Sequence, residues 1–354
     1  MTLTDDVGQV LAGGFEGPAP DPELLARIRA GRLGAVVLFA RNVVDPAQLA
    51  GLCAELQAAA PPDRPLLVAV DQEGGRVRRL RDPWAPWPSA ARMGASDDPE
   101  RVRAAGRAVG EELASCGIHL DLAPVLDVHT NPANPIIGDR AFGTTPGAVI
   151  RLAGAFAAGL ADADVAACGK HFPGHGDTEK DSHHELPLVA HARERLLAVE
   201  IAPFAALAPV LPAIMSAHVR YPALDPDLTA TLSPAVLGGI LRRRLGFGGV
   251  VLSDDLEMRA VADHYPPGAI AVAALEAGAD LLAFCRDADR VLAAEAALRD
   301  RAAADAGFAA RLAASSARVH RLKERYCRRP RPDPRNAEAV AGREAHHALA
   351  ASLA

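Results

Sequence analysis

Short apolar runs alternating with longer stretches of helical period are the feature that most restricts how this chain of 354 residues can fold. The runs are apolar on both faces, which is typical of parallel strands covered by helices. They span residues 8–12, 34–40, 66–71, 119–127, 165–170, 213–218, 249–254 and 280–285. Seven or eight such units favour a closed (β/α)8 barrel of the TIM type, an α/β fold, over an open doubly wound sheet.

Helical spacing of apolar residues is found between these runs, at residues 99–116, 146–160, 233–245, 267–277 and 287–300. The third of these segments starts with Ser233 and Pro234, a typical N-cap and first helical residue. No G-x-G-x-x-G motif follows the first run, which argues against a dinucleotide-binding fold.

The sequence changes character near its C-terminus. Residues 328–335 are rich in arginine and proline and interrupt the helical pattern, which returns over residues 337–353. We therefore predict a single barrel over residues 1–327, followed over residues 328–354 by a linker-like stretch and a short C-terminal helical tail. No second domain and no internal repeat is predicted.

Composition and charge exclude several classes of protein. Half of the residues are hydrophobic and 23% are charged, as in packed globular proteins. The net charge of −6 and the lack of a long basic block argue against a nucleic-acid partner. No apolar run reaches the roughly 18 residues of a membrane span. The sequence leaves the oligomeric state open and is compatible with a monomer.

The expected compartment is the cytoplasm. Residues 1–6 are acidic and lack the basic-then-apolar order of a signal peptide. The five cysteines are scattered, and none lies in a C-x-x-C pair. This usage indicates reduced thiols rather than a disulfide framework or a zinc knuckle.

Residues 170–183 carry the densest group of polar side chains in the sequence. The segment begins Lys-His-Phe-Pro-Gly-His-Gly and ends Asp-Ser-His, with two lysines, three histidines and three acids in all. Its two glycines and its proline exclude a regular helix through its first half. Because an apolar run leads into it, we expect these groups on a loop at the end of a strand, where functional residues concentrate.

Other polar residues also stand at strand ends. Asp71, Lys170 with His171, His218 and Asp254 follow or end four different apolar runs. In an α/β barrel the carboxyl ends of all strands open onto one face, where the active site lies. We therefore expect these distant residues to become neighbours.

Asp254 directly follows a buried run, in the sequence Gly-Val-Val-Leu-Ser-Asp-Asp. A carboxylate in this place can act as a nucleophile when nearby cations keep it ionised. The alternative is that Asp254 caps the next helix. Asp255 is the more natural capping residue, which would leave Asp254 to face a ligand.

Asp181 and His183 are two residues apart, so in an extended loop their side chains lie on the same side. A carboxylate beside an imidazole fixes its tautomer and raises its pKa, which suits a general acid/base. One alternative is a solvated polar loop. Another is metal binding by His171, His175, His183 and Asp177, but their spacing matches no compact zinc motif, so no metal is predicted.

Two further segments place arginines and acids after strands, at residues 71–79 and 138–140. Carboxylates and guanidinium groups are the usual means of holding sugar hydroxyls and carbonyl oxygens. His175 is expected to brace the loop rather than to bind a ligand. Trp84 and Trp87 are either a stacking surface or, as we expect, a wedge that fixes a proline-rich loop to the barrel.

Taken together, these segments resemble glycoside hydrolase family 3, specifically its β-N-acetylhexosaminidase branch. The matching pieces stand in the family's order over roughly residues 8–300. They are LFARN at 38–42, DQEGGRV at 71–77, NPIIGDRAFG at 134–143, KHFPGHGDTEKDSH at 170–183, SAHVRYPALDP at 216–226 and GFGGVVLSDDLEM at 246–258. The element at 170–183 is highly specific, whereas each of the others alone is moderate evidence.

The resemblance implies a TIM-type barrel that removes terminal β-linked N-acetylglucosamine with retention, through a covalent glycosyl-enzyme and without a cofactor. It implies that Asp254 is the nucleophile, His183 the acid/base and Asp181 its partner. The residues that match sugar-holding positions are Asp71, Arg79, Arg140, Lys170 and His171. The chain lacks the second domain from which some family members take their acid, which favours the histidine.

Similar single-domain cytoplasmic enzymes release N-acetylglucosamine from muropeptides during peptidoglycan recycling, so a muropeptide is the expected partner. One alternative is a phosphorylase, because an imidazole need not repel an incoming phosphate as a carboxylate would. Others are a broader β-glucosidase or hexosaminidase on the same scaffold and a sugar-binding barrel without catalysis.

Overall fold

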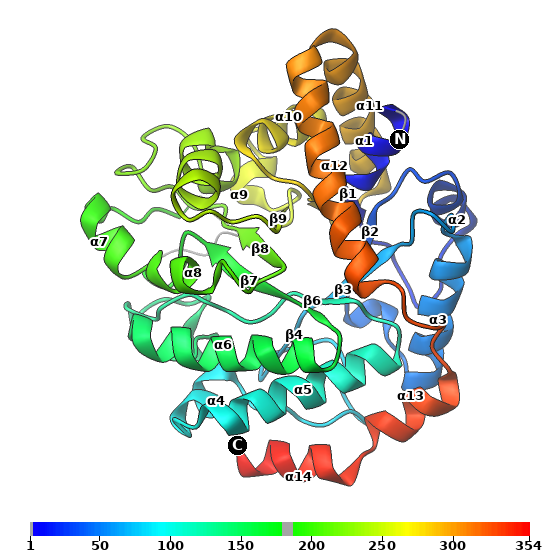
Figure 1. Cartoon of the computed structure of the whole chain (residues 1–354), viewed down its shortest axis with the longest axis vertical. Coiled ribbons are helices and arrows are strands. Elements are labelled where there is room, and N and C mark those ends of the chain that lie inside the picture. The colour runs from blue at the N-terminus through cyan, green and yellow to red at the C-terminus, as the bar shows by residue number, and fades with distance from the viewer. Residues whose placement is uncertain (1–2, 179–186) are drawn as a thin grey trace.

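The computed structural model describes residues 3–178 and 187–354, and in it eight parallel strands form one sheet (Figure 1). The strands are β1 (Leu11–Gly13), β2 (Ala35–Leu38), β3 (Leu67–Val70), β6 (Leu120–Asp121), β7 (Ala166–Phe172), β8 (Ala213–Ser216), β9 (Val250–Ser253) and β10 (Leu282–Phe284). They pair in the order β10-β1-β2-β3-β6-β7-β8-β9. A bridge between Leu252 and Leu281 joins the outer two strands, so the predicted (β/α)8 barrel is confirmed.

Helices cover the outside of this barrel. They include α2 (Pro22–Arg29), α3 (Pro46–Ala59), α5 (Pro99–Ser115), α6 (Pro146–Asp162), α7 (Arg193–Ala198), α8 (Ala202–Leu207), η4 (Pro234–Arg244), α10 (Pro267–Ala277) and α11 (Ala288–Ala304). In α2, α3, α5, α6 and η4 an Asp, Thr or Ser side chain caps the first turn and a proline follows it. The capping side chain accepts a hydrogen bond from an otherwise unpaired N–H, and the proline fixes the first φ angle of the helix. The start of each of these helices can therefore be predicted from a few neighbouring residues.

Shorter elements lie before the first strand and in the connections between the strands and the outer helices. They are α1 (Leu3–Gln9), η1 (Ala40–Asn42), the hairpin β4 (Gln72–Gly74) and β5 (Val77–Arg78), α4 (Ala90–Ala95), η2 (Gly138–Arg140), η3 (Ala230–Leu232) and α9 (Arg259–Ala262). The η2 segment and the β4–β5 hairpin matter for function, because both carry charged side chains into the cavity described below.

Two predicted strands differ from the observed ones. The first run was expected at residues 8–12, but residues up to Gln9 belong to α1 and the strand starts at Leu11. The run at 119–127 yields only a two-residue strand, because Pro124 has no N–H to donate. The chain beyond it still bonds to β7, with Leu126 N donating to Lys170 O at 2.6 Å. The predicted helix at 233–245 is present, wound as a π-helix.

The N-terminal end of the barrel is closed by α12 (Ala306–Tyr326). Val319 and Leu322 of this helix join the cluster of alanine, valine and leucine side chains inside the barrel. Lys323 is fully buried beside them, and its Nζ donates to Gln9 Oε1 at 2.6 Å. Because α12 fills this end, the space inside the barrel opens at the opposite end, where the strands have their carboxyl ends.

The C-terminal segment packs on the outside of the barrel. In Figure 1, α13 (Pro334–Ala341) and α14 (Glu344–Ser352) run beside α3 and α5. Arg329 Nη2 donates to Ile118 O at 2.7 Å, and His346 Nδ1 lies 3.2 Å from Glu112 Oε1. The domain boundary at residue 327 remains a prediction, but the helical tail is held to the barrel by side-chain contacts.

Several residues considered in the sequence are part of the core. Trp84 and Trp87 are buried, and Trp87 Nε1 donates to Glu112 Oε2 at 2.9 Å. They wedge their loop onto α5 and offer no surface for stacking. All five cysteines are buried free thiols. Within residues 3–178 and 187–354, no helix has both the length and the hydropathy needed to cross a bilayer.

Candidate active site

A cavity of about 200 Å³ lies at the carboxyl ends of the strands. Six of the predicted site residues line it together, namely Asp71, Arg79, Arg140, Lys170, His171 and Asp254. They come from five places in the chain: the ends of β3, β7 and β9, the β4–β5 hairpin and η2. Apolar side chains such as Val37, Leu122 and Met215 form the rest of the wall.

Five charged residues along one wall form an ionic chain, Arg79–Asp71–Lys170–Glu73–Arg140. Lys170 Nζ lies 2.7 Å from Asp71 Oδ1 and 2.6 Å from Glu73 Oε1. Arg79 Nη2 donates to Asp71 Oδ2 at 3.0 Å. Arg140 donates to both oxygens of Glu73, at 2.8 Å each. Each side chain is thereby fixed by its neighbours, which preorganises the wall for a polar ligand.

The ionic chain keeps its charges in spite of burial. Burial alone would raise the pKa of Asp71, but Lys170 and Arg79 outweigh it and hold that pKa below its usual value. Burial likewise opposes ionisation of Glu73, and Arg140 and Lys170 lower its pKa to about 2. The same partners raise the pKa of Lys170 against the effect of its burial. The wall therefore presents constant charges over the pH range of ordinary assays.

His171 continues this wall beside Arg140. Its Nδ1 lies 2.7 Å from Oδ2 of Asp127, a fully buried carboxylate, and its Nε2 lies 3.5 Å from Arg140 Nη2. Asp127 Oδ1 also accepts the backbone N–H groups of His171 and His175, at 3.2 and 2.6 Å. One carboxylate thus holds the start of the loop that follows β7.

The second polar wall is the turn after β9. Asp254 Oδ1 accepts the N–H of Asp255 at 2.9 Å. Asp255 Oδ1 accepts the N–H groups of Glu257 and Cys285, so Asp255 caps this turn and not the following helix, contrary to expectation. His218 does not line the cavity: its Nε2 lies 3.0 Å from Asp255 O, behind the turn. The arrangement presents Asp254 to the cavity on a braced turn.

Asp255 makes the stability of the fold sensitive to pH. Burial, with the nearby Glu257 and Asp254 charges, raises its pKa from 3.8 to about 7. Between these values the folded state binds more protons than the unfolded state, so the contribution of Asp255 to stability falls as the pH rises. Asp255→Asn keeps the acceptor oxygen without the charge. We expect it to raise the free energy of unfolding by on the order of 2 kcal/mol at pH 8.

The measurement is urea unfolding of Asp255→Asn and the unsubstituted protein at pH 8 and pH 4. The difference should shrink toward pH 4, because the carboxyl is protonated there in the folded state and only partly ionised in the unfolded state, so little of the cost of the buried charge remains. A difference that is the same at both pH values would contradict the assignment of this titration to Asp255.

The loop after β7 is described up to residue 178. His175 is buried, and its Nδ1 lies 2.8 Å from Thr178 Oγ1. Burial, with the nearby His171, lowers the pKa of His175 to about 4, so the ring is neutral at ordinary pH. Asp177 accepts from Thr130 Oγ1 at 2.8 Å. These contacts brace the loop, and His175 also forms part of the cavity wall.

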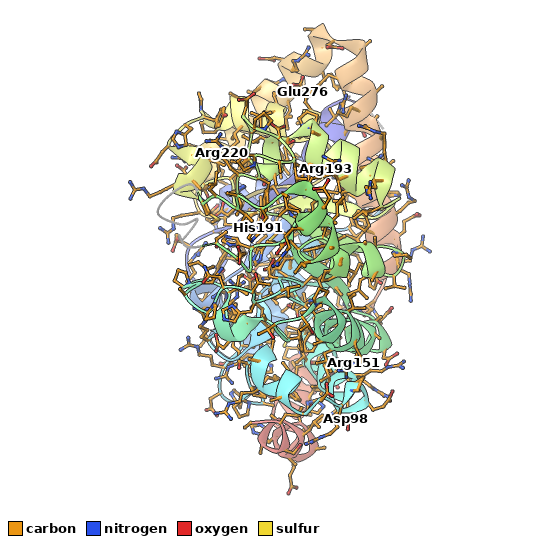
Figure 2. All side chains as sticks on the ribbon, turned by 90° about the vertical axis from the view of Figure 1, so that its left-hand side faces the viewer. Asp98, Arg151, His191, Arg193, Arg220 and Glu276 are labelled. Carbon is orange, nitrogen blue, oxygen red and sulfur yellow. The ribbon has the colours of Figure 1, made fainter. Side chains whose placement is uncertain are left out.

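The predicted acid/base pair, Asp181 and His183, lies outside the described residues. The described chain resumes at residue 187, and Nε2 of His191 lies 2.5 Å from Asp177 Oδ2. Figure 2 shows His191 on the face of the molecule that is turned toward the viewer. The chain before residue 179 and the chain after residue 186 are therefore joined by the contact between Asp177 and His191.

Two site residues were not singled out from the sequence, Glu73 and Asp127. Glu73 lies two residues after Asp71, and in a strand-like segment that spacing puts both side chains on one face. Asp127 ends the apolar run 119–127, so its position at the end of a strand could have identified it, as it did the other strand-end residues.

Among the described residues, no group of three His, Cys, Asp or Glu side chains is arranged to hold a metal ion. The fold and cavity together define a TIM-barrel enzyme that acts on a polar substrate.

Comparison with known proteins identifies the family. Residues 2–322 match the "Glycosyl hydrolase family 3 N terminal domain". A "Beta-hexosaminidase" of Alkalilimnicola ehrlichii is 43% identical over 285 residues, which are 78% of this chain and 81% of that protein. A glycoside hydrolase family 3 β-N-acetylglucosaminidase from Paenibacillus sp. str. FPU-7 has a TM-score of 0.91 and 40% identity, covering 100% of this chain and 68% of that one.

A third relative is NagZ from Neisseria gonorrhoeae, solved in complex with N-trifluoroacetyl-D-glucosamine. It has a TM-score of 0.77 and 33% identity, and covers 98% of this chain and 97% of that one. The chain therefore belongs to glycoside hydrolase family 3, in its β-N-acetylhexosaminidase branch, and is a glycoside hydrolase.

Proposed function

We propose that the protein is a retaining exo-β-N-acetylglucosaminidase, with Asp254 as nucleophile, His183 as acid/base and Asp181 as the partner of His183. The observation that carries the proposal is that Asp254 shares one cavity of about 200 Å³ with the ionic chain and His171. A space of this size suits one sugar ring rather than a longer chain, which favours removal of a terminal residue.

The proposed binding step uses the ionic chain. Lys170, Arg79 and Arg140 donate N–H groups toward sugar hydroxyls, and the ionised Asp71 accepts from them. Because these groups already bond to one another, they need little reorganisation when the sugar enters. The ring is then held with its anomeric carbon toward Asp254.

The chemical steps follow from two side chains. A carboxylate oxygen of Asp254 attacks the anomeric carbon, the glycosidic bond breaks, and His183 gives its proton to the departing oxygen. The product is a glycosyl ester on Asp254 and a free aglycone. The neutral His183 then takes a proton from water as that water attacks the same carbon, which releases Asp254. Two inversions give net retention.

The relatives support N-acetylglucosamine as the sugar. Two of those described are named for β-N-acetylglucosaminidase or β-hexosaminidase activity, and the third was solved with a derivative of D-glucosamine. We propose that the natural substrates are muropeptides derived from peptidoglycan, cleaved in the cytoplasm. No cofactor, nucleic acid or membrane has a part in this mechanism.

The test of the reaction is cleavage of a chromogenic β-N-acetylglucosaminide and of a muropeptide, each with and without phosphate. We expect N-acetylglucosamine of retained configuration as the product in both conditions. N-acetylglucosamine 1-phosphate as the main product would replace hydrolysis with phosphorolysis. Binding of the sugar without turnover would contradict both reactions.

The role of His183 is tested by His183→Ala. Loss of a general acid costs most when the leaving group is poor, so we expect a loss of about 10²- to 10⁴-fold on the muropeptide and a smaller loss on a nitrophenyl glycoside. His347→Ala is the matched control, because His347 lies on α14 and its Nε2 is 3.1 Å from Pro83 O. Equal losses on both substrates would count against the assignment of the acid.

A further inference from the structure

The buried carboxylate of Asp127 makes three hydrogen bonds to His171 and His175. These residues belong to the cavity wall and to the first part of the loop after β7, which we call the loop root. Its Oδ1 accepts the backbone N–H groups of His171 and His175, and its Oδ2 lies 2.7 Å from His171 Nδ1. The side chain is fully buried and does not line the cavity. It therefore acts on a ligand only through the groups that it holds.

The partners of His171 determine where its ring carries a proton. An ionised carboxylate only accepts hydrogen bonds, so Nδ1, which faces Asp127, carries a proton. On the other side, Nε2 lies 3.5 Å from Arg140 Nη2. A guanidinium only donates and stays charged, so the nitrogen that faces it keeps its lone pair. Both neighbours select the same tautomer, with the proton on Nδ1.

We propose that Asp127 is a positioning residue that makes His171 a hydrogen-bond acceptor for a hydroxyl of the bound sugar. The inference rests on the proposed function, since it assumes a sugar in the cavity. Lys170, Arg79 and Arg140 supply donors on the same wall, and Asp71 is an acceptor that two of these cations already share. An acceptor at His171 Nε2 therefore requires one sugar hydroxyl to donate its proton.

The geometry at Asp127 allows a selective substitution. In Asp127→Asn, the amide oxygen at the Oδ1 position still accepts the N–H groups of His171 and His175. The NH₂ group then takes the place of Oδ2 and donates toward His171 Nδ1. His171 is forced into the opposite tautomer and turns an N–H toward Arg140 and the sugar. The loop root stays bonded while the polarity of His171 is reversed.

The experiment is a double-mutant cycle of Asp127→Asn, His171→Ala and the combined variant. It measures the Kd for N-acetylglucosamine by calorimetry and kcat/KM on the chromogenic substrate. We expect each single variant to weaken binding by about 10- to 100-fold. The combined variant should be no weaker than His171→Ala, because Asp127 acts through that ring. Additive losses would overturn the proposal, since Asp127 would then act through another group.

Two further arms make the outcome specific. Analogues of N-acetylglucosamine with one hydroxyl replaced by fluorine keep an acceptor but lose the donor. At one ring position, we expect the fluoro analogue to bind the unsubstituted protein as weakly as the deoxy analogue, in which hydrogen replaces the hydroxyl. We expect Asp127→Asn to bind that fluoro analogue with little loss of affinity. Equal tolerance at every position in both proteins would contradict an acceptor at His171.

Asn134→Ala is the control for loosening the loop root, because Asn134 Nδ2 donates to His175 O at 2.9 Å without touching His171. It should keep the fluorine pattern of the unsubstituted protein, and adoption of the Asp127→Asn pattern would overturn the proposal. If the protein does not hydrolyse the glycoside but the effects of Asp127→Asn and His171→Ala on sugar binding are still non-additive, only the proposed function is contradicted. An additive cycle in an active enzyme would contradict only the role of Asp127.

Discussion

Asp254→Asn is expected to lower kcat/KM for a chromogenic β-N-acetylglucosaminide by on the order of 10³-fold or more. An amide is far less nucleophilic than the carboxylate that it replaces, so the glycosyl ester no longer forms. The fold should be kept, because the Asn oxygen can still accept the N–H of Asp255 as Asp254 Oδ1 does. The measurement is steady-state kinetics, with thermal unfolding to show that stability is unchanged.

The neighbouring carboxylate provides the comparison for this variant. Asp255→Asn removes a charge from the same turn, and we expect a much smaller loss of activity from it. A slow fluorinated substrate should also label the unsubstituted enzyme, and the added mass should be found on Asp254. Label on Asp255, or near-normal activity in Asp254→Asn, would refute the assignment of the nucleophile.

Lys170→Met is expected to have the second largest effect, on both stability and binding. Lys170 is 2% exposed and lies between the carboxylates of Asp71 and Glu73. Its removal leaves two buried negative charges with one arginine each, and breaking such a buried pair costs about 3–5 kcal/mol. Urea unfolding should show this loss. In the proposed binding mode Lys170 also donates to the sugar, so the KM for the glycoside should rise by about 10²-fold or more.

A second substitution separates the two effects of Lys170→Met. Glu73→Gln in the same chain removes one of the buried charges left behind and keeps an oxygen for Arg140. The double variant should recover part of the lost stability but none of the lost affinity. Recovery of both would mean that Lys170 acts only as a structural counter-ion and does not contact the sugar.

Local sequence signals account for most of the fold. The apolar runs are buried on both faces in the barrel, and five outer helices start at an N-cap followed by proline, so both element types could be identified from short segments. Errors arose where tertiary contacts overrode the local pattern. Residues before Leu11 form a helix that packs on α12, and residues 123–126 bond to β7 around a proline.

The candidate site was predictable in part, for a related reason. Asp71, Lys170 and Asp254 follow strands, and the parallel topology alone brings strand ends to one face. Asp127 also ends an apolar run, but its role depends on which atoms it contacts, and no local pattern expresses that. Glu73 gains its importance from Lys170 and Arg140, which are 97 and 67 residues away.

Strand periodicity and chain direction are local properties, so the (β/α)8 barrel and the meeting of Asp71, Lys170 and Asp254 at its open end could be predicted from the order of amino acids alone. How those side chains are paired, and that Glu73 joins them while His218 does not, follows only from the folded barrel. The ionic chain, the capping of the β9 turn by Asp255 and the orientation of His171 by Asp127 depend on distances of a few ångströms between distant segments. Such distances are set by packing of the whole barrel and not by any one segment.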